Sequence, residues 1–209
     1  MVKIKAFERH AAEYEEWFDD YHYVYESELE ALRLLLPEGG AGLEVGIGTG
    51  RFALPLGIEF GVEPAKAMAE RARAKNLQVV RAVGEALPFA NAGFDKVLFV
   101  TSVCFLDSVD RAFQEAFRVM RTGGALLIGF IDKDSFLGRN YEKRKKDSLF
   151  YREANFHSVE EILGSLGKAG FRDFKVVETI FRPLDQITAR ESIKEGYGEG
   201  AFVVVRAIK

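Results

Sequence analysis

Short apolar runs alternate with longer amphipathic segments along most of the 209-residue chain. The runs are rich in Val, Leu, Ile and Phe, which is typical of strands buried on both faces of a parallel sheet. Seven strands are predicted, at 43–45, 57–63, 77–82, 94–100, 125–131, 171–181 and 201–208. Apolar residues at helical spacing predict helices at 7–36 in two pieces, 65–75, 108–120 and 162–169. This alternation indicates an α/β domain with helices on both faces of the sheet.

The first half of the segment 7–36 carries an unusual set of side chains. Aromatic and acidic residues are interleaved there, namely Tyr14, Trp17, Phe18, Tyr21, Tyr23 and Tyr25 with Glu13, Glu15, Glu16, Asp19 and Asp20. Two interpretations stay open. In one, the rings pack the helices onto the body of the domain, as large amphipathic aromatics often do. In the other, they form a lid that presents rings and carboxylates to a cationic ligand.

The composition argues against several classes of function. A net charge of −3 and a pI near 5.8 disfavour a nucleic-acid-binding protein that relies on bulk electrostatics. The basic stretch 139–146 is interpreted first as a solvated helix face and second as a phosphate or nucleic-acid patch. Cys104 is the only cysteine, so no intrachain disulfide is expected. No run approaches the ~20 apolar residues of a membrane span, and no signal peptide is recognised. We therefore expect a soluble, cytoplasmic protein without a metal site.

Three glycines at alternate positions, Gly46, Gly48 and Gly50, follow the first predicted strand, and a stretch compatible with a helix follows them. Such glycines let the backbone turn sharply where a strand ends and approach a ligand closely. A dinucleotide-binding loop has the spacing G-x-G-x-x-G, whereas this loop reads G-x-G-x-G with Glu44 before it. A second acidic residue, Glu63, ends the next strand, where a carboxylate suits ribose hydroxyls. The loop therefore predicts a nucleotide-like ligand.

Five stretches of the chain resemble, in order and spacing, the motifs of one known family. They are 43–52, 61–64, 84–89, 94–97 and 118–124. The first resembles motif I (E/D-x-G-x-G-x-G) of the class I S-adenosylmethionine-dependent methyltransferases, and the last resembles the R-V-L-K-P-G-G turn before their fifth strand. The sub-group most resembled contains the ubiquinone and menaquinone C-methyltransferases. The resemblance implies a Rossmann-like, doubly wound, mostly parallel seven-stranded sheet with an antiparallel C-terminal strand and an N-terminal helical cap.

The resemblance also implies which residues bind S-adenosylmethionine. They are Glu44, Gly46, Ile47, Gly48, Gly50, Glu63, Pro64, Met68, Gly84, Glu85, Thr101 and Ser102. Glu44 would lie near the amino group of the cofactor, and Glu63 would hold both ribose hydroxyls. Thr101 and Ser102 would lie near the transferable methyl group. Val83 stands where the family often has Asp or Thr on the adenine amino group, so recognition there would pass to neighbouring backbone groups.

Methyl transfer from a sulfonium is an in-line displacement at an activated carbon. The main task of such a protein is to align the acceptor with the methyl group and to exclude water. A general base is optional, and none stands out. The three histidines are first interpreted as structural or exposed, yet His22, within the predicted lid, is a candidate catalytic residue, as is Tyr21 beside it. Residues 100–104 contain no Asn-Pro-Pro-Tyr-like motif, which disfavours amino-methylation of adenine or glutamine.

We expect one domain over 1–209, with a cap or lid at 1–36, a cofactor-binding core at 37–131, a substrate-side insert at 132–157 and a C-terminal helix and strands at 158–209. The predicted function is methyl transfer to a small molecule bound between lid and insert. The aromatic and acidic lid favours an amine. The alternatives are a protein or RNA methyltransferase, a non-catalytic S-adenosylmethionine-binding module and, more distantly, a nicotinamide-dependent dehydrogenase. Neither a nucleic acid nor a membrane is an expected partner, and the chain is expected to be a monomer or homodimer.

Overall fold

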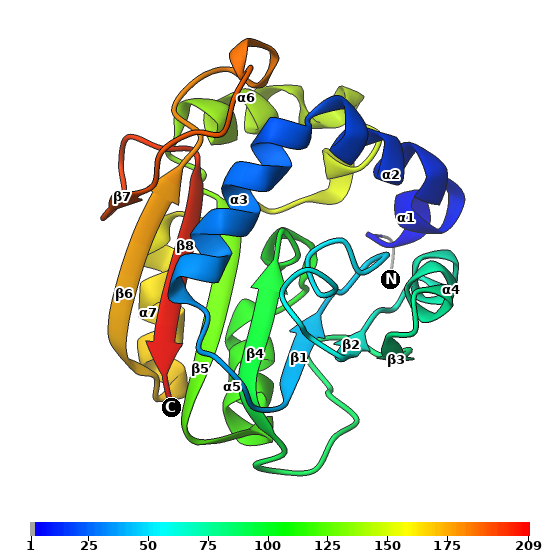
Figure 1. Ribbon diagram of the computed structural model, residues 1–209, viewed down its shortest axis with the longest axis vertical. Helices are drawn as coiled ribbons and strands as arrows, with labels where there is room; N and C mark the ends of the chain where they lie inside the picture. The colour runs from blue at the N-terminus through cyan, green and yellow to red at the C-terminus, as the bar shows by residue number, and fades with distance from the viewer. Residues whose placement is uncertain (1–2) are drawn as a thin grey trace.

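One sheet of eight strands organises the computed structural model, which describes residues 3–209 (Figure 1). The strand order is β3-β2-β1-β4-β5-β8-β6-β7. The strands are β1 (Gly42–Val45), β2 (Phe60–Val62), β3 (Gln78–Val80), β4 (Phe94–Val100), β5 (Met120–Ile131), β6 (Arg172–Thr179), β7 (Lys194–Glu195) and β8 (Phe202–Ile208). Neighbours from β3 to β5 run parallel, and the pairs β5–β8, β8–β6 and β6–β7 run antiparallel. The predicted fold class is confirmed. The two-residue β7 was not predicted, because so short a strand has no periodic pattern.

Helices occupy both faces of the sheet and the edge at which its parallel strands end. They are α1 (Lys5–Arg9), α2 (Ala11–Asp20), α3 (His22–Leu35), α4 (Lys66–Ala74), α5 (Val109–Val119), α6 (Phe136–Arg144) and α7 (Val159–Ala169), with the short 3-10 helices η1 (Val103–Phe105), η2 (Lys145–Asp147), η3 (Tyr151–Glu153) and η4 (Leu184–Gln186). The N-terminal segment forms three helices rather than the two predicted pieces. The backbone leaves the helical region at His10 and at Tyr21, where ψ is 37° and 43°.

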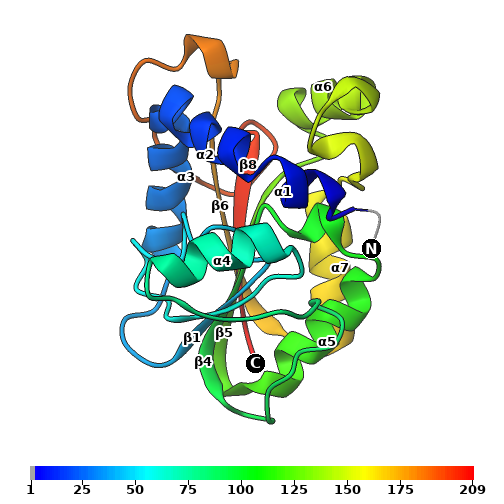
Figure 2. The same ribbon diagram turned by 90° about the vertical axis from the view of Figure 1, so that its right-hand side faces the viewer.

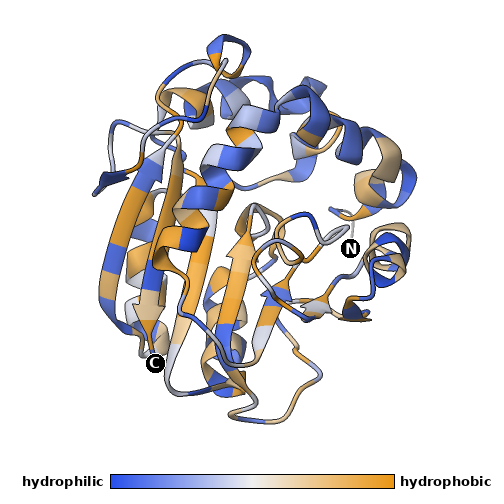
Figure 3. Cartoon of the chain, viewed as in Figure 1, coloured by the Kyte–Doolittle hydropathy of each residue, from blue (hydrophilic) through white to orange (hydrophobic). Residues whose placement is uncertain are grey.

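Side chains that alternate along the central strands form two separate cores, because successive residues of a strand point to opposite faces. Leu98 of β4 belongs to the cluster that contains Leu32 of α3. Its neighbour Phe99 belongs to the cluster that contains Phe113 of α5 and Ile162 of α7. Accordingly, α3 and α4 lie on one side of the sheet and α5 and α7 on the other (Figure 2). The hydropathy colouring shows apolar strands enclosed between these two helical layers (Figure 3).

The stretch after the three glycines forms turns over 49–57 instead of a regular helix. The N–H groups of Leu54 and Leu56 reach back four residues, at 3.2 and 3.3 Å, but Pro55 between them has no N–H to donate. A pyrophosphate-binding loop depends on a regular helix N-terminus. The local structure therefore departs from that of a dinucleotide-binding site.

The N-terminal helices form a cap over the ends of β1 and β4, beside α6 (Figures 1 and 2). Glu8 of α1 fastens the cap to the body of the domain. Its carboxylate accepts hydrogen bonds from the N–H groups of Lys66 and Ala67 at the start of α4, at 2.9 and 2.8 Å. These two bonds hold the pKa of Glu8 below its usual value. The carboxylate thus supplies, from a distant segment, the cap that α4 lacks in its own sequence.

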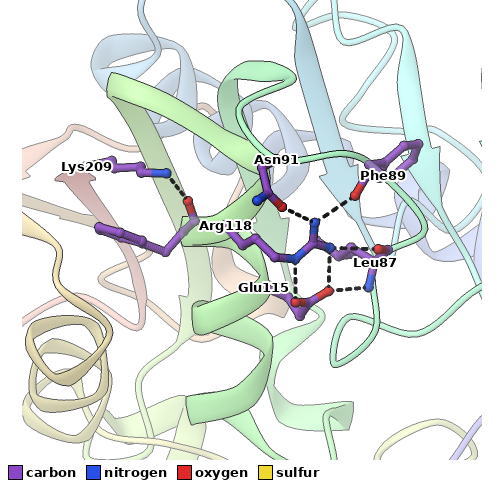
Figure 4. A network of polar contacts seen from close by, with 7 residues as sticks. Leu87, Phe89, Asn91, Glu115, Arg118 and Lys209 are labelled. Carbon is purple, nitrogen blue, oxygen red and sulfur yellow. Dashed lines mark hydrogen bonds and ion pairs between the residues drawn. The ribbon is translucent and has the colours of Figure 1, made fainter.

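Arg118 of α5 holds the loop that follows β3 (Figure 4). Its guanidinium donates to the backbone oxygens of Leu87 and Phe89, to the side chain of Asn91 and to both carboxylate oxygens of Glu115, at 2.8–2.9 Å. Glu115 also accepts from the N–H of Leu87, at 2.9 Å. A planar guanidinium with several donors suits such a cluster of acceptors. The loop that lines one side of the cavity described below is therefore fixed from outside it.

We expect Arg118→Met to lower the free energy of unfolding by about 2 kcal/mol, because the substitution removes charge-assisted hydrogen bonds to three loop positions. The corresponding fall in Tm is roughly 4–8 °C. Denaturant titration and calorimetry measure both values. The control is Arg71→Met on the exposed side of α4, where residues 3–209 supply no ion pair to Arg71. Equal stability of the two variants would contradict the role assigned to Arg118.

Candidate active site

A cavity of about 440 Å³ lies between the cap and the ends of the parallel strands. Nine residues implied as cofactor ligands line it, namely Gly46, Gly48, Glu63, Pro64, Met68, Gly84, Glu85, Thr101 and Ser102. They come from the loops that follow β1, β2, β3 and β4 and from the start of α4. Ligands of open α/β sheets bind at this edge, outside the carboxyl ends of the strands. The volume of the cavity lies within the usual range for sites that bind a cofactor or a small ligand, roughly 300–1,000 Å³.

The glycine loop is held against β2 by backbone hydrogen bonds. The N–H groups of Gly46 and Ile47 donate to the oxygen of Val62, at 2.8 and 3.1 Å. Gly46 has φ of +76°, and a Cβ at this position would lie 2.6 Å from the Cβ of Ser102. Gly48 has φ of +56° and faces the hydroxyl of Tyr14, 3.4 Å from where a Cβ would stand. Side chains at these two positions would strain the turn and occupy the cavity.

Glu63 connects the glycine loop to the start of α4. Its Oε2 accepts the N–H of Gly48 at 2.9 Å, and its Oε1 accepts the N–H of Ala65 at 2.8 Å. The residue is 7% exposed, and burial raises the pKa of its carboxyl to about 7 against the opposing effect of the two N–H groups. Each carboxylate oxygen has a second acceptor site. Glu63 is therefore positioned rigidly and still has acceptor capacity for a ligand in the cavity.

The opposite wall comes from the loops after β3 and β4. Glu85 accepts the N–H groups of Asp107 and Ser108 with Oε1, at 2.7 and 3.2 Å, which joins the two loops. Ser102 donates its hydroxyl to the oxygen of Val45 at 2.8 Å, so its side chain is committed to the end of β1. Thr101 has a left-handed backbone with φ of +48°. Backbone shape, more than free side-chain groups, defines this wall.

Three of the implied cofactor ligands lie outside the cavity lining, namely Glu44, Ile47 and Gly50. Glu44 is 1% exposed, its Oε2 finds no partner among residues 3–209, and burial raises its pKa well above the usual value. Ile47 packs into the core against Gly61. Gly50 has φ of +83° and packs closely against Leu77. These three residues therefore contact the interior of the domain and support the glycine loop on the side away from the cavity.

The candidate catalytic residues His22 and Tyr21 also lie outside the cavity lining. His22 is exposed, with its ring centroid 3.9 Å from that of Tyr23. Tyr21 packs against Trp17 at 5.3 Å between ring centroids. The break between α2 and α3 at Tyr21 turns His22 outward. Neither side chain is placed to touch a ligand in the cavity.

Sequence reasoning named Tyr14, Trp17 and Phe18 as part of a possible lid, but it missed the other rings at the end of the cavity that faces the cap and the insert. Aromatic residues from both segments line it, namely Phe7, Tyr14, Trp17, Phe18, Tyr141, Phe150 and Tyr151, together with Phe105 of η1. Several are in ring contact: the rings of Tyr141 and Tyr151 stack at 5.0 Å, and those of Tyr14 and Phe18 meet edge to face at 5.1 Å. Rings of the aromatic segment therefore both pack against the core and line the cavity. None of the acidic residues interleaved with them lines the cavity, and the cationic ligand stays a prediction.

Glu28 of α3 lies among these rings. It lines the cavity, is 3% exposed, and receives no hydrogen bond or ion pair from any group in residues 3–209. Burial raises the pKa of its carboxyl from 4.5 to about 8. One signal of this position was present in the sequence: Glu28 falls one helical turn from Val24 and Leu32, on the buried stripe of α3. A charged residue on that stripe needs an explanation.

Comparison with known proteins places the chain in a family. A methyltransferase domain model matches residues 43–128. The malonyl-[acyl-carrier protein] O-methyltransferase of Geobacter sulfurreducens is 32% identical over 202 residues, which cover 83% of this chain and 71% of that protein. A Thermotoga maritima structure, described as an S-adenosylmethionine-dependent methyltransferase and possible histamine N-methyltransferase, is 50% identical, with a TM-score of 0.95 and 98% of each chain covered. An uncharacterised protein of Methanocaldococcus jannaschii is 44% identical over 99% of this chain and 100% of its own.

The chain belongs to the S-adenosylmethionine-dependent methyltransferases. The residues of this methyltransferase fit the cofactor, because the glycine loop leaves the cavity free where side chains would fill it and Glu63 offers acceptors to hydroxyl groups. Within residues 3–209, no grouping of three or more His, Cys, Asp or Glu side chains is suited to a metal ion. No helix of that part of the chain combines the length and the apolar character needed to cross a membrane.

We expect Glu63→Gln to weaken S-adenosylmethionine binding about 10- to 100-fold, because one oxygen acceptor replaces two where backbone N–H groups and ligand hydroxyls all donate. Titration calorimetry measures the affinity, and circular dichroism verifies the fold. Glu59→Gln, at an exposed position just before β2, is the matched control. Unchanged affinity in Glu63→Gln would remove Glu63 from the cofactor site.

The raised pKa of Glu28 gives a stability prediction. Below pH 4.5 the carboxyl is protonated in the folded and the unfolded chain, so its ionisation does not affect stability. Between pH 4.5 and about 8 the unfolded chain ionises while the folded chain stays protonated, and the wild type loses stability relative to Glu28→Gln. We expect the difference to grow by on the order of 3 kcal/mol, or roughly 6–12 °C in Tm, and to level off above that window.

Calorimetric melting of both proteins from pH 4 to pH 9 measures this difference. Glu26→Gln on the same helix, with a half-exposed side chain, is expected to show no such growth. A stability difference between wild type and Glu28→Gln that does not change with pH would show that the carboxyl is not desolvated.

Proposed function

We propose that this methyltransferase transfers the methyl group to a small-molecule acceptor, and that the acceptor is an amine. One observation carries the proposal: the end of the cavity beyond the cofactor ligands is lined by aromatic rings and one buried carboxylate, Glu28. Aromatic faces and a carboxylate together attract a cation. The cap and the insert cover this end, so the acceptor must be small enough to be enclosed.

The chain itself supplies alignment and exclusion of water. S-adenosylmethionine supplies a methyl carbon that is already activated by the sulfonium. Glu63 and the glycine loop would fix the position of that donor, and the aromatic wall would hold the acceptor in line with it. Tyr14 connects the two ends, because its hydroxyl lies over Gly48 and its ring packs against Phe18 and Phe150. Positioning of this kind contributes up to ~7–11 kcal/mol in ideal cases.

The relatives support methyl transfer to different atoms. The Thermotoga structure, at 50% identity, is described as a possible histamine N-methyltransferase, which favours nitrogen. The Geobacter protein, at 32% identity, is an O-methyltransferase. The resemblance of the motifs to the quinone C-methyltransferases supports a small acceptor but not a nitrogen atom. The aromatic rings and the buried Glu28 carboxyl in the cavity lining support an amine over the other two acceptors.

A protein or RNA acceptor is less well supported. The basic stretch 139–146 lies mostly on the exposed side of α6 and η2, with Lys145 paired to Glu142. The exposure of these polar side chains agrees with the interpretation of the stretch as a solvated helix face. We propose a monomer or homodimer that works in the cytoplasm without a nucleic-acid partner.

The test is release of S-adenosylhomocysteine during incubation with S-adenosylmethionine and pools of small amines, phenols, carboxylic acids and quinols. We expect turnover with at least one amine pool and mass-spectrometric detection of a product heavier by one methylene. Turnover confined to a pool without amines would overturn the amine assignment. Turnover with bulk RNA or protein, and with no small-molecule pool, would overturn the small-molecule assignment.

A further inference from the structure

We propose that Glu28 is a catalytic residue of the acceptor site, which binds the protonated nitrogen of the amine and takes one proton from it before methyl transfer. This inference rests on the proposed function. It assigns a role to a side chain that no motif of the family identifies, and it concerns the cap rather than the cofactor-binding loops.

The first argument is the lack of a partner within the protein. A buried carboxylate normally finds donors, because an unpaired one loses its hydration without compensation. Glu63 in the same cavity has two backbone N–H groups. Glu28 has neither such groups nor an ion pair among residues 3–209. A carboxyl placed on the buried stripe of α3 without structural partners is explained by a ligand that supplies the missing donor.

The second argument is the surroundings of Glu28. Its charge contributes to raising the pKa values of Tyr14, Tyr141 and Tyr151, after their own burial, so it lies within electrostatic reach of all three phenol groups. These tyrosines come from α2, α6 and η3 and line the same cavity. Their rings offer negative faces to a cation. An anionic ligand group would meet these ring faces and oppose ionisation of Glu28. Lys3 and Arg111 also line the cavity, but burial alone raises the pKa of Glu28, so neither cation acts on this carboxyl.

The third argument is that the protonation state of Glu28 responds to a bound ligand. In the empty cavity burial keeps its carboxyl largely protonated near neutral pH. An ammonium group beside it favours the ionised form, since an opposite charge at close range offsets desolvation. The three tyrosines that share this lining stay neutral because burial, first of all, raises their pKa values. Two other titratable groups lie nearby: Tyr21, within electrostatic reach of Tyr141, and Lys3, which donates to the oxygen of Leu106 and pairs with Asp107. Glu28 is therefore the group at this end of the cavity that changes charge with the ligand.

In the proposed step, Glu28 and the bound ammonium exchange one proton before the methyl group moves. The bound ammonium gives one proton to the Glu28 carboxylate, which leaves a nitrogen lone pair. That pair forms the nitrogen–carbon bond while the carbon–sulfur bond breaks and its electron pair stays on sulfur. The positive charge passes from sulfur to the product nitrogen, and beside this cation Glu28 loses the transferred proton to water. The carboxyl, which released a proton to water when the ammonium bound, takes one up again when the product leaves the cavity, so one proton is released per turnover. A base with a pKa near the working pH suits this exchange.

The experiment compares ligands that share a shape but differ in charge. Titration calorimetry of the full chain with S-adenosylhomocysteine present uses two amines, histamine and 2-phenylethylamine, and their alcohol analogues, in which a hydroxyl replaces the ammonium. We expect wild type to bind at least one amine more tightly than its alcohol. In Glu28→Gln that amine should bind about 30-fold more weakly or worse, with the alcohol unchanged. Glu28→Asp should recover part of the loss, and Glu26→Gln should match wild type.

The outcomes separate the inference from the proposed function. Equal weakening of amine and alcohol in Glu28→Gln would mean that Glu28 only shapes the cavity, which overturns the inference. The inference would also be overturned if wild type bound neither amine, or if it bound each amine no more tightly than the corresponding alcohol. If wild type methylates an amine and Glu28→Gln does so at the same rate and affinity, the inference fails while the proposed function stands. If wild type methylates only uncharged or anionic acceptors, the amine assignment itself fails.

Discussion

The structure depends on the bridge that the Glu63 carboxylate makes between the N–H groups of Gly48 and Ala65. Burial of a carboxylate is unfavourable, and the two N–H groups offset part of that cost, which leaves the pKa at about 7. In return, the loop after β1 and the start of α4 are joined through one side chain. The edge of the sheet where the cofactor is expected therefore has a fixed shape before any ligand arrives, which is the condition for alignment of a donor with an acceptor.

The two ends of the cavity are built on different principles. The cofactor end consists of loops that continue from strands, held by backbone hydrogen bonds such as those of Gly46 and Ile47 to Val62. The acceptor end consists of side chains from the cap and the insert, which meet only through tertiary packing. The cap is fastened to the start of α4 by Glu8, which directly follows the cavity-lining Phe7. Because the two ends are built from different segments, substitutions in the cap and the insert can change the acceptor without changing the loops of the cofactor end.

The sequence predicted what local patterns encode. Apolar runs predicted β4 with its observed bounds, and helical spacing predicted α7 except for its first three residues. The glycine loop and Glu63 were placed at the cavity because each directly follows a strand. Glu28 and Tyr141 could not be placed there, since their meeting depends on how the cap and insert fold back over the sheet. His22 is exposed and lies outside the cavity lining, in agreement with the first interpretation of the histidines.

In the proposed function, the selectivity of the cavity rests on the contrast between two buried carboxyl groups. Glu63 accepts two N–H groups of the protein and keeps acceptor capacity for the hydroxyl groups of a ligand. Glu28 is unsatisfied by residues 3–209, so the unfavourable free energy of its burial is relieved only by a ligand that brings a donor or a positive charge. A neutral acceptor would relieve it in part, and an anionic acceptor would keep the Glu28 carboxyl protonated, without the ion pair that an ammonium group forms. The preference for a cationic acceptor thus follows from the unfavourable burial of Glu28 in the protein without ligand. The aromatic wall excludes water and so strengthens the electrostatic part of this preference.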